Sequence, residues 1–458
     1  MARMSVLTVD SLLTALPEGV VVTDPATLEN YRYDWSRDPG AGTPLAVARP
    51  TDAVQVQAIV RWCGDNQVPL VPRGAGTSLS GGSSAVDGGI VLSLERMRAI
   101  EIDTTTRVAV VEPGAFNAEV KAAAAAHGLW YPPDPSSYEI CSIGGNIATN
   151  AGGLCCVKYG VTTDYVLGLD VVLADGELIT LGGKRIKDVA GLSLLKLFIG
   201  SEGTLGIITR AVLRLLPAQP PRATLVATFP DPEAAARAVV ALGLVARPSM
   251  VELMDNASIN IVEDYRSMGL DRDAGALLLV QSDAAGAAST AEIALAEEAC
   301  QRNGATECFS TDDAEEGEMF AEARRIFFPA VEGRGALLLE DVGAPVPQLP
   351  ALLAGIAAIA AQRQVDIPVV AHAGDGNTHP TIVFDPADPA ARDRAALAFT
   401  EIMALAISLG GTITGEHGIG RLKKELLPTQ LGPRVTQLNR QVKQLLDPEG
   451  ILNPGAIL

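Results

Sequence analysis

PRGAGTSLSGG, at residues 72–82, is a glycine-rich loop that follows the short apolar run VPLV, which predicts a β-strand. Closely spaced glycines let the backbone approach a ligand and point N–H groups at it, and Thr77, Ser78 and Ser80 add hydroxyl groups. These features suit a pyrophosphate, although a loop that only forms turns is the simpler interpretation of this stretch by itself. The spacing is not the GxGxxG of the dinucleotide-binding fingerprint.

Two further loops of the same kind strengthen the ligand interpretation. They are SIGGNIATNAGG at residues 142–153 and GSEGTLG at residues 200–206. The nearest candidate for a Walker A motif, GEHGIG at residues 415–420, is followed by Arg421 and Leu422 in place of Lys and Ser or Thr. We therefore expect one long, extended dinucleotide held by several loops, in preference to a single nucleotide at one helix start.

Length, charge and composition limit the classes of protein that fit. The chain has 458 residues, which predicts two large domains or two with an appendage. A net charge of −19 opposes general nucleic-acid binding. No apolar run approaches the roughly 20 residues of a membrane span, and the N-terminus shows no signal peptide, so we expect an intracellular protein. The six cysteines form no CxxC and are expected to be reduced thiols.

The pattern of the chain changes at PAQPPRA, residues 217–223, where three prolines oppose regular structure and indicate a domain boundary. Before it, a helix at 52–66 and strands such as GIVLSL and RVAVVEP alternate, and GLDVVLADGELITL predicts a hairpin turning at Asp175 and Gly176. After it, helices at 231–242, 288–303 and 350–364 alternate with strands such as ALLLVQSD and PVVAHAG. This second part predicts an α+β domain, and the last stretch predicts a helix and an irregular tail that packs back on a domain.

Three of the four histidines fall within residues 372–417. His372 and His379 belong to AHAGDGNTH, which follows a predicted strand, and GEH at residues 415–417 lies after a helix. Two imidazoles and a carboxylate form a ligand set for a divalent metal that leaves positions open for a substrate. The alternative is a group of polar histidines satisfied by ordinary hydrogen bonds.

Five motifs in this order resemble the vanillyl-alcohol-oxidase/PCMH type of FAD-binding domain: RGAGTSLSGG, PDP at 133–135, SIGGNIATNAGG, KYG at 158–160 and GSEGTLGIIT. The chain is similar, from about residue 44 onward, to the branch containing D-lactate dehydrogenase, the glycolate oxidase flavin subunit and D-2-hydroxyglutarate dehydrogenase. The resemblance implies an α+β fold in which a two-subdomain FAD-binding domain, residues 1–217, meets a cap with an antiparallel sheet, residues 218–425. A C-terminal segment, residues 426–458, is expected to pack back on the FAD-binding domain.

The resemblance also implies which residues contact FAD. Relatives that attach FAD covalently through the first loop carry His where Thr77 stands, so the FAD is expected to be non-covalent. Leu192 and Ser193 depart from the Tyr-Asp that the family commonly has before its third loop. The expected FAD contacts are Pro72, Arg73, Gly74, Ala75, Gly76, Thr77, Ser78, Pro135, Ser142, Gly144, Gly145, Asn150, Gly152, Glu202, Ile207, Ile208 and Asn453.

The cap motifs HxGDGNxH and GEHG carry the remaining implied roles. In the family the two histidines and the glutamate hold zinc or manganese, which gives His372, His379 and Glu416 as ligands and His417 as the catalytic base. Counting back from FPAV places the substrate-carboxylate arginine at Arg324, with Arg325 as the fallback, and Asn377 as a further polar contact. Leu339 stands where 2-hydroxyglutarate relatives have Lys, which favours a small or apolar substrate side chain.

These expectations define an FAD- and metal-dependent dehydrogenase of small D-2-hydroxy acids such as D-lactate or glycolate. Two alternatives stay open: D-2-hydroxyglutarate dehydrogenase, and a flavin subunit that passes electrons to an iron–sulfur partner, since this chain has no CxxCxxC motif. A quinone, a cytochrome, an electron-transfer protein and an iron–sulfur subunit are the candidate acceptors. We expect no nucleic-acid partner, no transmembrane segment and a cytoplasmic location, with peripheral membrane association and a homodimer both open.

Overall fold

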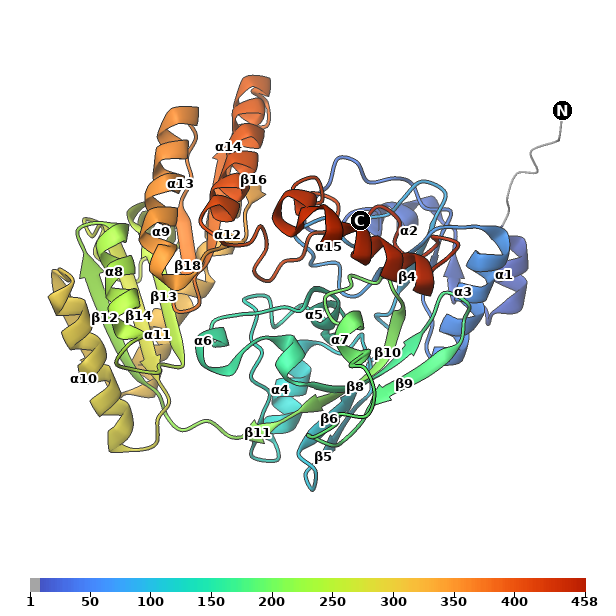
Figure 1. Ribbon diagram of the computed structural model, residues 1–458, viewed down its shortest axis with the longest axis horizontal. Coiled ribbons are helices and arrows are strands. Elements are labelled where there is room, and N and C mark those ends of the chain that lie inside the picture. The colour runs from blue at the N-terminus through green and yellow to red at the C-terminus, as the bar shows by residue number, and fades with distance from the viewer. Residues whose placement is uncertain (1–8) are drawn as a thin grey trace.

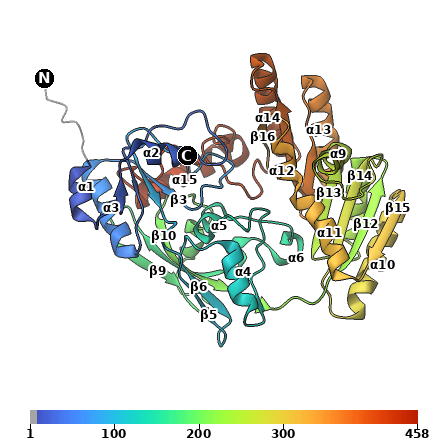
Figure 2. The same ribbon diagram turned by 180° about the vertical axis from the view of Figure 1, so that it is seen from behind.

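Two lobes joined by a short crossing segment make up residues 9–458, the part of the chain that the computed structural model describes (Figure 1, Figure 2). The chain crosses between β11 (Leu216–Pro217) and β12 (Ala223–Phe229), at the proline-rich stretch that breaks the sequence pattern. Residues up to 217 build the first lobe and residues 223–412 the second, and the chain then returns between them. Within the described residues, no helix is both long and apolar enough to cross a bilayer.

The first sheet of the first lobe has the order β1-β2-β4-β3, with β2 and β3 parallel to β4. Asp52 begins helix α3 because its side chain accepts a hydrogen bond from the N–H of Gln55. The helically spaced Val56, Ile59 and Cys63 are buried against the sheet, so the helix expected at 52–66 is confirmed. The elements are α1 (Asp10–Ala15), β1 (Val21–Val22), α2 (Pro25–Asn30), β2 (Ala46–Ala48), α3 (Ala53–Asn66), β3 (Leu70–Arg73) and β4 (Ile90–Ser93).

The second sheet of this lobe is antiparallel, with the order β5-β6-β10-β8-β9. The expected hairpin is confirmed: β8 and β9 pair across a turn in which Gly176 has φ +77°, a conformation that glycine adopts without strain. The elements are β5 (Ile100–Asp103), β6 (Val108–Val111), α4 (Asn117–Ala125), β7 (Leu129–Trp130), α5 (Ile143–Thr149), α6 (Cys156–Tyr159), η1 (Thr162–Asp164), β8 (Val166–Val172), β9 (Leu178–Gly182), α7 (Leu195–Phe198) and β10 (Ile207–Arg214).

The second lobe is built on one large antiparallel sheet with the order β15-β12-β14-β13-β18-β19-β16, and β17 also pairs with β19. One face packs on α8, α10, α13 and α14 around a large apolar core, and the other packs on α9, α11 and α12 (Figure 1). The strands are β12, β13 (Met250–Asp255), β14 (Ala276–Ser282), β15 (Glu307–Thr311), β16 (Ala336–Leu339), β17 (Val342–Gly343), β18 (Val369–His372) and β19 (Asn377–Phe384). The helices are α8 (Pro232–Leu242), α9 (Asn256–Tyr265), α10 (Ala287–Arg302), α11 (Ala314–Arg325), α12 (Phe327–Glu332), η2 (Val346–Gln348), α13 (Leu349–Arg363) and α14 (Pro389–Ser408).

The last helix and tail contact both lobes. Helix α15 (Leu427–Leu446) bends at Gly432; Leu427 is buried in the second-lobe core, whereas Leu446 packs against the first lobe. Beyond the helix, Ile451 and Leu452 are buried in the first-lobe core. The N–H of Leu70 donates to the carbonyl of Ile451 over 2.8 Å, so the tail pairs in parallel alongside the strand that leads into the first glycine loop.

Candidate active site

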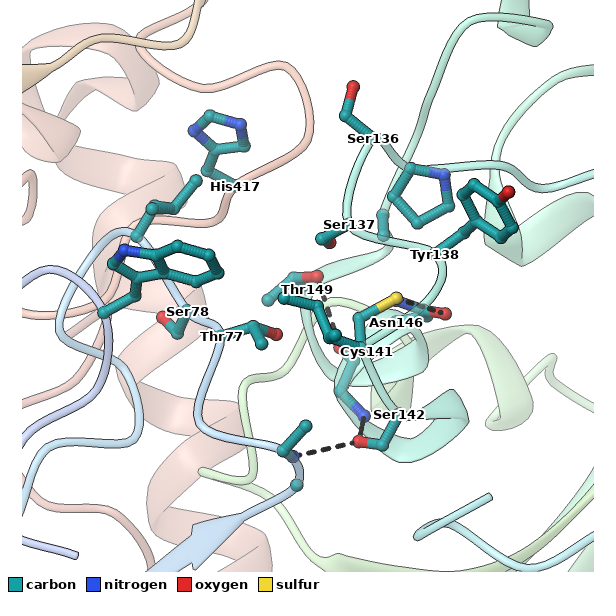
Figure 3. Close-up of a pocket in the computed structure, with 18 of the residues that line it drawn as sticks. Thr77, Ser78, Ser136, Ser137, Tyr138, Cys141, Ser142, Asn146, Thr149 and His417 are labelled. Carbon is teal, nitrogen blue, oxygen red and sulfur yellow. Dashed lines mark hydrogen bonds between the residues drawn. The ribbon is translucent and has the colours of Figure 1, made fainter. Parts of the chain in front are cut away.

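A cavity of about 680 Å³ lies where the three glycine loops of the first lobe face the second lobe. Its second-lobe side is formed by α11, α12 and β16, together with the histidine cluster. Figure 3 shows His417 across the cavity from Ser136 and Ser137, with Thr77 and Ser78 below His417 in this view. The expected FAD contacts that line the cavity are Pro72, Arg73, Gly74, Ala75, Gly76, Thr77, Ser78, Pro135, Ser142, Gly144, Gly145, Glu202, Ile207 and Ile208.

The first two glycine loops are locked together by a single hydroxyl. Ser142 Oγ accepts hydrogen bonds from the N–H of Ala75 and the N–H of Gly145, each over 3.3 Å (Figure 3). A Cβ on Gly74 would lie 2.2 Å from this hydroxyl, so only glycine permits the approach. The wall is therefore made of backbone and hydroxyl groups, which fits a bound dinucleotide that is recognised by its phosphates.

Three of the expected FAD contacts lie outside this wall. Asn150 ends α5 and its side-chain oxygen accepts from the N–H of Thr163, and Gly152 lines a different cavity. Asn453 is buried and donates to the carbonyls of Gly82 and Glu202. These residues hold the loops in position, and their direct contact with FAD stays a prediction.

Glu202 lines the cavity, but its carboxylate is engaged by the returning chain. Its two oxygens accept from the N–H groups of Ile419 and Gly420, over 2.7 and 2.9 Å. Burial raises the pKa of Glu202 to about 7, and these two N–H groups oppose the rise. The third glycine loop thus fixes the chain segment that follows His417.

The histidine pair stands on adjacent strands of the second-lobe sheet. His372 ends β18, and His379 lies in β19 opposite Val370, so both histidines are on the same face of the sheet. Glu252 of β13 lies directly opposite His372 in the strand register, and so on the same face. This face looks away from the α8, α10, α13 and α14 layer and toward the first lobe (Figure 2).

Glu416 brings the three histidines together. Its Oε1 atom lies 3.3 Å from Nε2 of His372, 3.2 Å from Nε2 of His379 and 3.6 Å from Nε2 of His417. The rings of His379 and His417 are stacked with centroids 4.9 Å apart. The structure therefore gathers all three expected ligands and the expected base around one carboxylate oxygen.

Charge and burial shift the pKa values of the residues in this cluster in opposite directions. Burial alone would lower the pKa of His372, but the carboxylates of Glu252 and Glu416 raise it well above its usual value. Burial would likewise raise the pKa of Glu416, but the histidines, His372 foremost, hold it well below its usual value. For His379, burial prevails and lowers the pKa. One donor atom each of Asp341, His379, Glu416 and His417 lies within 4.8 Å of the others, a group that includes Asp341 and His417 and leaves out His372. Among the described residues, Asp341 Oδ1 and His379 Nδ1 are buried without a hydrogen-bond partner, and such a donor set fits a divalent cation.

Asp341 organises the loop that carries Glu416 and His417, a role the sequence analysis missed. Its Oδ2 atom accepts four hydrogen bonds: from the hydroxyl of Thr414 over 2.6 Å, and from the N–H groups of Gly415, Glu416 and His417 over 2.8–3.0 Å. Burial would raise its pKa, but His417, Lys423 and His379 hold it below its usual value. Two adjacent acids, Glu340 and Asp341, after an apolar strand are the one signal in the sequence for this role.

Glu252 was also missed, and it links the histidine cluster to the expected substrate arginine. Its Oε1 lies 2.7 Å from His372 Nδ1, and its Oε2 lies 2.8 Å from Arg324 Nε. Glu252 is 1 % exposed and Arg324 5 % exposed, so this is a buried pair. The acid in the middle of the apolar run MVELM, residues 250–254, is the signal that could have found it, because a buried charge needs a partner.

Arg324 lines the cavity and keeps an unpaired donor as far as the described residues show, whereas its neighbour Arg325 pairs with a glutamate. Nη2 of Arg324 is buried and has no hydrogen-bond partner among the described residues, and the residue lines the cavity. Arg325 instead forms an ion pair with the exposed Glu318. Leu339 lines the same cavity, while Asn377 lines the second cavity, on the other side of Glu416. The geometry thus favours Arg324 over Arg325 for binding a substrate carboxylate.

Comparisons with known proteins agree with this architecture. Residues 218–457 match the family model "FAD linked oxidases, C-terminal domain", and residues 44–182 match "FAD binding domain". The chain is 40% identical over 430 residues to the glycolate oxidase subunit GlcD of Bacillus subtilis, covering 93% of this chain and 91% of the relative. It is 36% identical to a D-lactate dehydrogenase of Archaeoglobus fulgidus (93% and 95% covered) and 34% identical to a D-2-hydroxyglutarate dehydrogenase of Xanthomonas citri pv. viticola (98% and 96% covered). The fold matches the structure of p-cresol methylhydroxylase with a TM-score of 0.82 at 18% identity, covering 98% of this chain and 95% of that one.

Proposed function

Because the chain belongs to the family of FAD-linked oxidases, we propose that it oxidises small D-2-hydroxy acids, such as D-lactate or glycolate, to 2-oxo acids. The observation that carries this proposal is the convergence of three groups on one cavity. The glycine loops, Arg324, and three members of the histidine cluster, His379, Glu416 and His417, all line it. FAD, bound through the loops, supplies the hydride acceptor for this reaction.

The residues around Glu416 provide for the hydroxyl end of the substrate. His372, His379 and Glu416 would hold a divalent cation, zinc or manganese, and such a cation supplies Lewis-acid chemistry that lowers the pKa of an α-hydroxyl. What supports this is the buried set of nitrogen and carboxylate donors within hydrogen-bond reach of one another. His417 lines the FAD cavity beside them and accepts the hydroxyl proton at Nε2.

Arg324 and Leu339 provide for the rest of the substrate. The guanidinium of Arg324 binds the substrate carboxylate through Nη2, and Glu252 holds the guanidinium in place at Nε. Leu339 offers an apolar surface in the cavity wall. A substrate side chain that is small or apolar suits this wall better than a second carboxylate, which separates the proposal from 2-hydroxyglutarate oxidation.

Anaerobic reduction of the bound flavin tests the proposal without an electron acceptor. We expect D-lactate or glycolate to bleach the flavin absorbance, L-lactate to be slower than D-lactate, and D-2-hydroxyglutarate to be slower than both of the favoured substrates. Dialysis against a chelator should abolish flavin reduction by the substrate, and added zinc or manganese should restore it. Fastest reduction by D-2-hydroxyglutarate would contradict the substrate assignment, and full activity after complete removal of metal would contradict the metal.

A second candidate is a flavin subunit that works only within a larger complex. The relative with 40% identity is named as a subunit of glycolate oxidase, and the sequence here has no iron–sulfur motif. Affinity purification from the native host should then recover a cysteine-rich protein together with this chain. Steady turnover of the isolated chain with a physiological acceptor would contradict this second candidate.

We expect the flavin to be bound without a covalent bond. Thr77 stands in the cavity wall on the first glycine loop, and no His or Cys occurs within residues 72–82 to attach the isoalloxazine. Acid precipitation of the yellow protein should leave all FAD fluorescence in the supernatant. Fluorescence that remains with the precipitated polypeptide would show a covalent link elsewhere.

The Arg324→Lys variant should lose about 10–100-fold in kcat/KM, mainly through KM. Lysine keeps the positive charge facing Glu252 but lacks the planar fork that binds a carboxylate through two N–H groups. The matched control is Arg325→Lys, at the neighbouring position whose side chain pairs with Glu318. Equal losses in both variants would mean that a general positive charge, and not Arg324, recognises the substrate.

A further inference from the structure

A second cavity, of about 480 Å³, also borders the Glu416 cluster. Residues 152–161 of the first lobe form one wall, and segments 343–345, 372–377 and 410–415 form the others. Glu416 lines both cavities, whereas His372 lines only this one and His379 and His417 only the FAD cavity. Among the described residues, the two cavities share only Glu416 in their linings.

The lining of the second cavity is suited to a cation. It contains the carboxylates of Asp375 and Glu416, the thiol of Cys156, the imidazole of His372 and the amide of Asn377. Neither Lys nor Arg lines it, as far as the described residues show, whereas the FAD cavity has Arg73, Arg324 and Arg325 among its carboxylates. The second cavity therefore attracts a divalent cation with no opposing positive side chain in its described wall.

Asn377 adds an observation that is independent of the acidic groups. The residue is 9 % exposed, and its Oδ1 atom is buried without a hydrogen-bond partner within the described residues. An unpaired amide oxygen is costly to bury unless a ligand uses it. It lines the same cavity as the carboxylates of Asp375 and Glu416, and oxygen donors of this kind suit a hard or borderline cation.

We propose that this second cavity is the path by which the divalent cation reaches and leaves the Glu416 cluster while FAD and substrate fill the first cavity. This inference rests on the proposed metal site. Asp375 attracts the cation at the exposed end, and Asn377 binds it on the way to His372 and Glu416. Neither residue is a ligand in the final site, so both act on the rates of exchange.

The experiment measures metal uptake by FAD-loaded protein that has been stripped with a chelator. Zn²⁺ is mixed rapidly with wild type and variants, and its disappearance is followed with a zinc-sensitive dye, which does not depend on catalysis. Asp375→Asn should slow uptake about tenfold, with one zinc still bound per chain at saturation. The matched control is Asp385→Asn, since both aspartates are exposed and each accepts a hydrogen bond from a backbone N–H two residues later. Asp375 accepts from Asn377 over 3.2 Å, and Asp385 accepts from Ala387 over 2.8 Å.

A second variant blocks the cavity by size. Cys156→Phe should slow uptake and release of zinc by the same factor, leaving the affinity unchanged, whereas Cys156→Ser should exchange zinc at the wild-type rate. Thermal unfolding and FAD content establish that each variant is folded. If Cys156→Phe does not fold, the comparison of Asp375→Asn with Asp385→Asn tests the proposal. Uptake at the wild-type rate in Asp375→Asn or in folded Cys156→Phe overturns the path, whereas a wild-type protein that binds no zinc overturns the metal site itself.

Discussion

In the His417→Ala variant, flavin reduction by a D-2-hydroxy acid should slow by about 10²–10⁴-fold, the usual contribution of a positioned base. Metal content and FAD content should stay at wild-type levels, since His372, His379 and Glu416 remain. The geometry permits two roles for His417, base and metal ligand, because its Nε2 lies 3.6 Å from Glu416 Oε1, only slightly farther than the nitrogens of the expected ligands. The metal content of the variant distinguishes these two roles.

Stopped-flow absorbance under anaerobic conditions measures this step directly. The control is His127→Ala, which removes the one histidine outside the cluster, an exposed residue after α4. It should reduce flavin at the wild-type rate. A wild-type rate in His417→Ala would exclude the base role, and loss of metal from that variant would make His417 a ligand.

Removal of His372 or His379 should abolish metal binding and turnover while FAD stays bound. The histidines lie on β18 and β19 of the second lobe, whereas the glycine loops that hold FAD belong to the first.

Glu252→Gln should have a smaller effect and lower the metal affinity about 10–100-fold, because the glutamate orients His372 through Nδ1 without binding the metal. Glu252 is thus a positioning residue.

Metal analysis and the flavin spectrum, recorded on the same samples, check this series. Glu263→Gln is the matched control for Glu252→Gln: Glu263 is a buried glutamate of the same lobe that accepts from the N–H groups of Met268 and Leu270, far from the cluster in the sequence. Wild-type metal content in His372→Ala or His379→Ala would remove that residue from the ligand set. Equal effects of Glu252→Gln and Glu263→Gln would reduce the role of Glu252 to general stability.

The sequence correctly predicted the elements that depend only on residues close to one another in the chain. The helix after Asp52 and the turn at Gly176 depend on residues within one or two turns of chain, and both are where the pattern predicts them. The antiparallel sheet of the second lobe followed from resemblance. The clustering of His372, His379 and Glu416 was expected from spacing and family motifs, and the structure brings these side chains together.

Contacts set by strand register and by the returning chain could not be read from the sequence. Glu252 meets His372 only because β13 pairs with β18 in one register; a shift by one residue would turn the carboxylate to the opposite face. Asp341 meets residues 414–417 from more than seventy positions away. The hydrogen bonds from the amide of Asn453 to the carbonyls of two glycine loops depend on how the tail packs, and the contact of Asn453 with FAD stays a prediction.

The pairing of residues 451–453 with the strand at Leu70 has a consequence for biosynthesis. Leu70 leads into the first glycine loop, and its N–H and carbonyl are bonded to Ile451 and Asn453. The ribosome makes these partners only after it has made the whole second lobe. Although N-terminal domains generally fold first during translation, the first lobe of this protein lacks part of its core until then. The nascent chain therefore acquires a complete flavin site late, and a chain released before residue 451 has an open sheet edge beside the FAD loop.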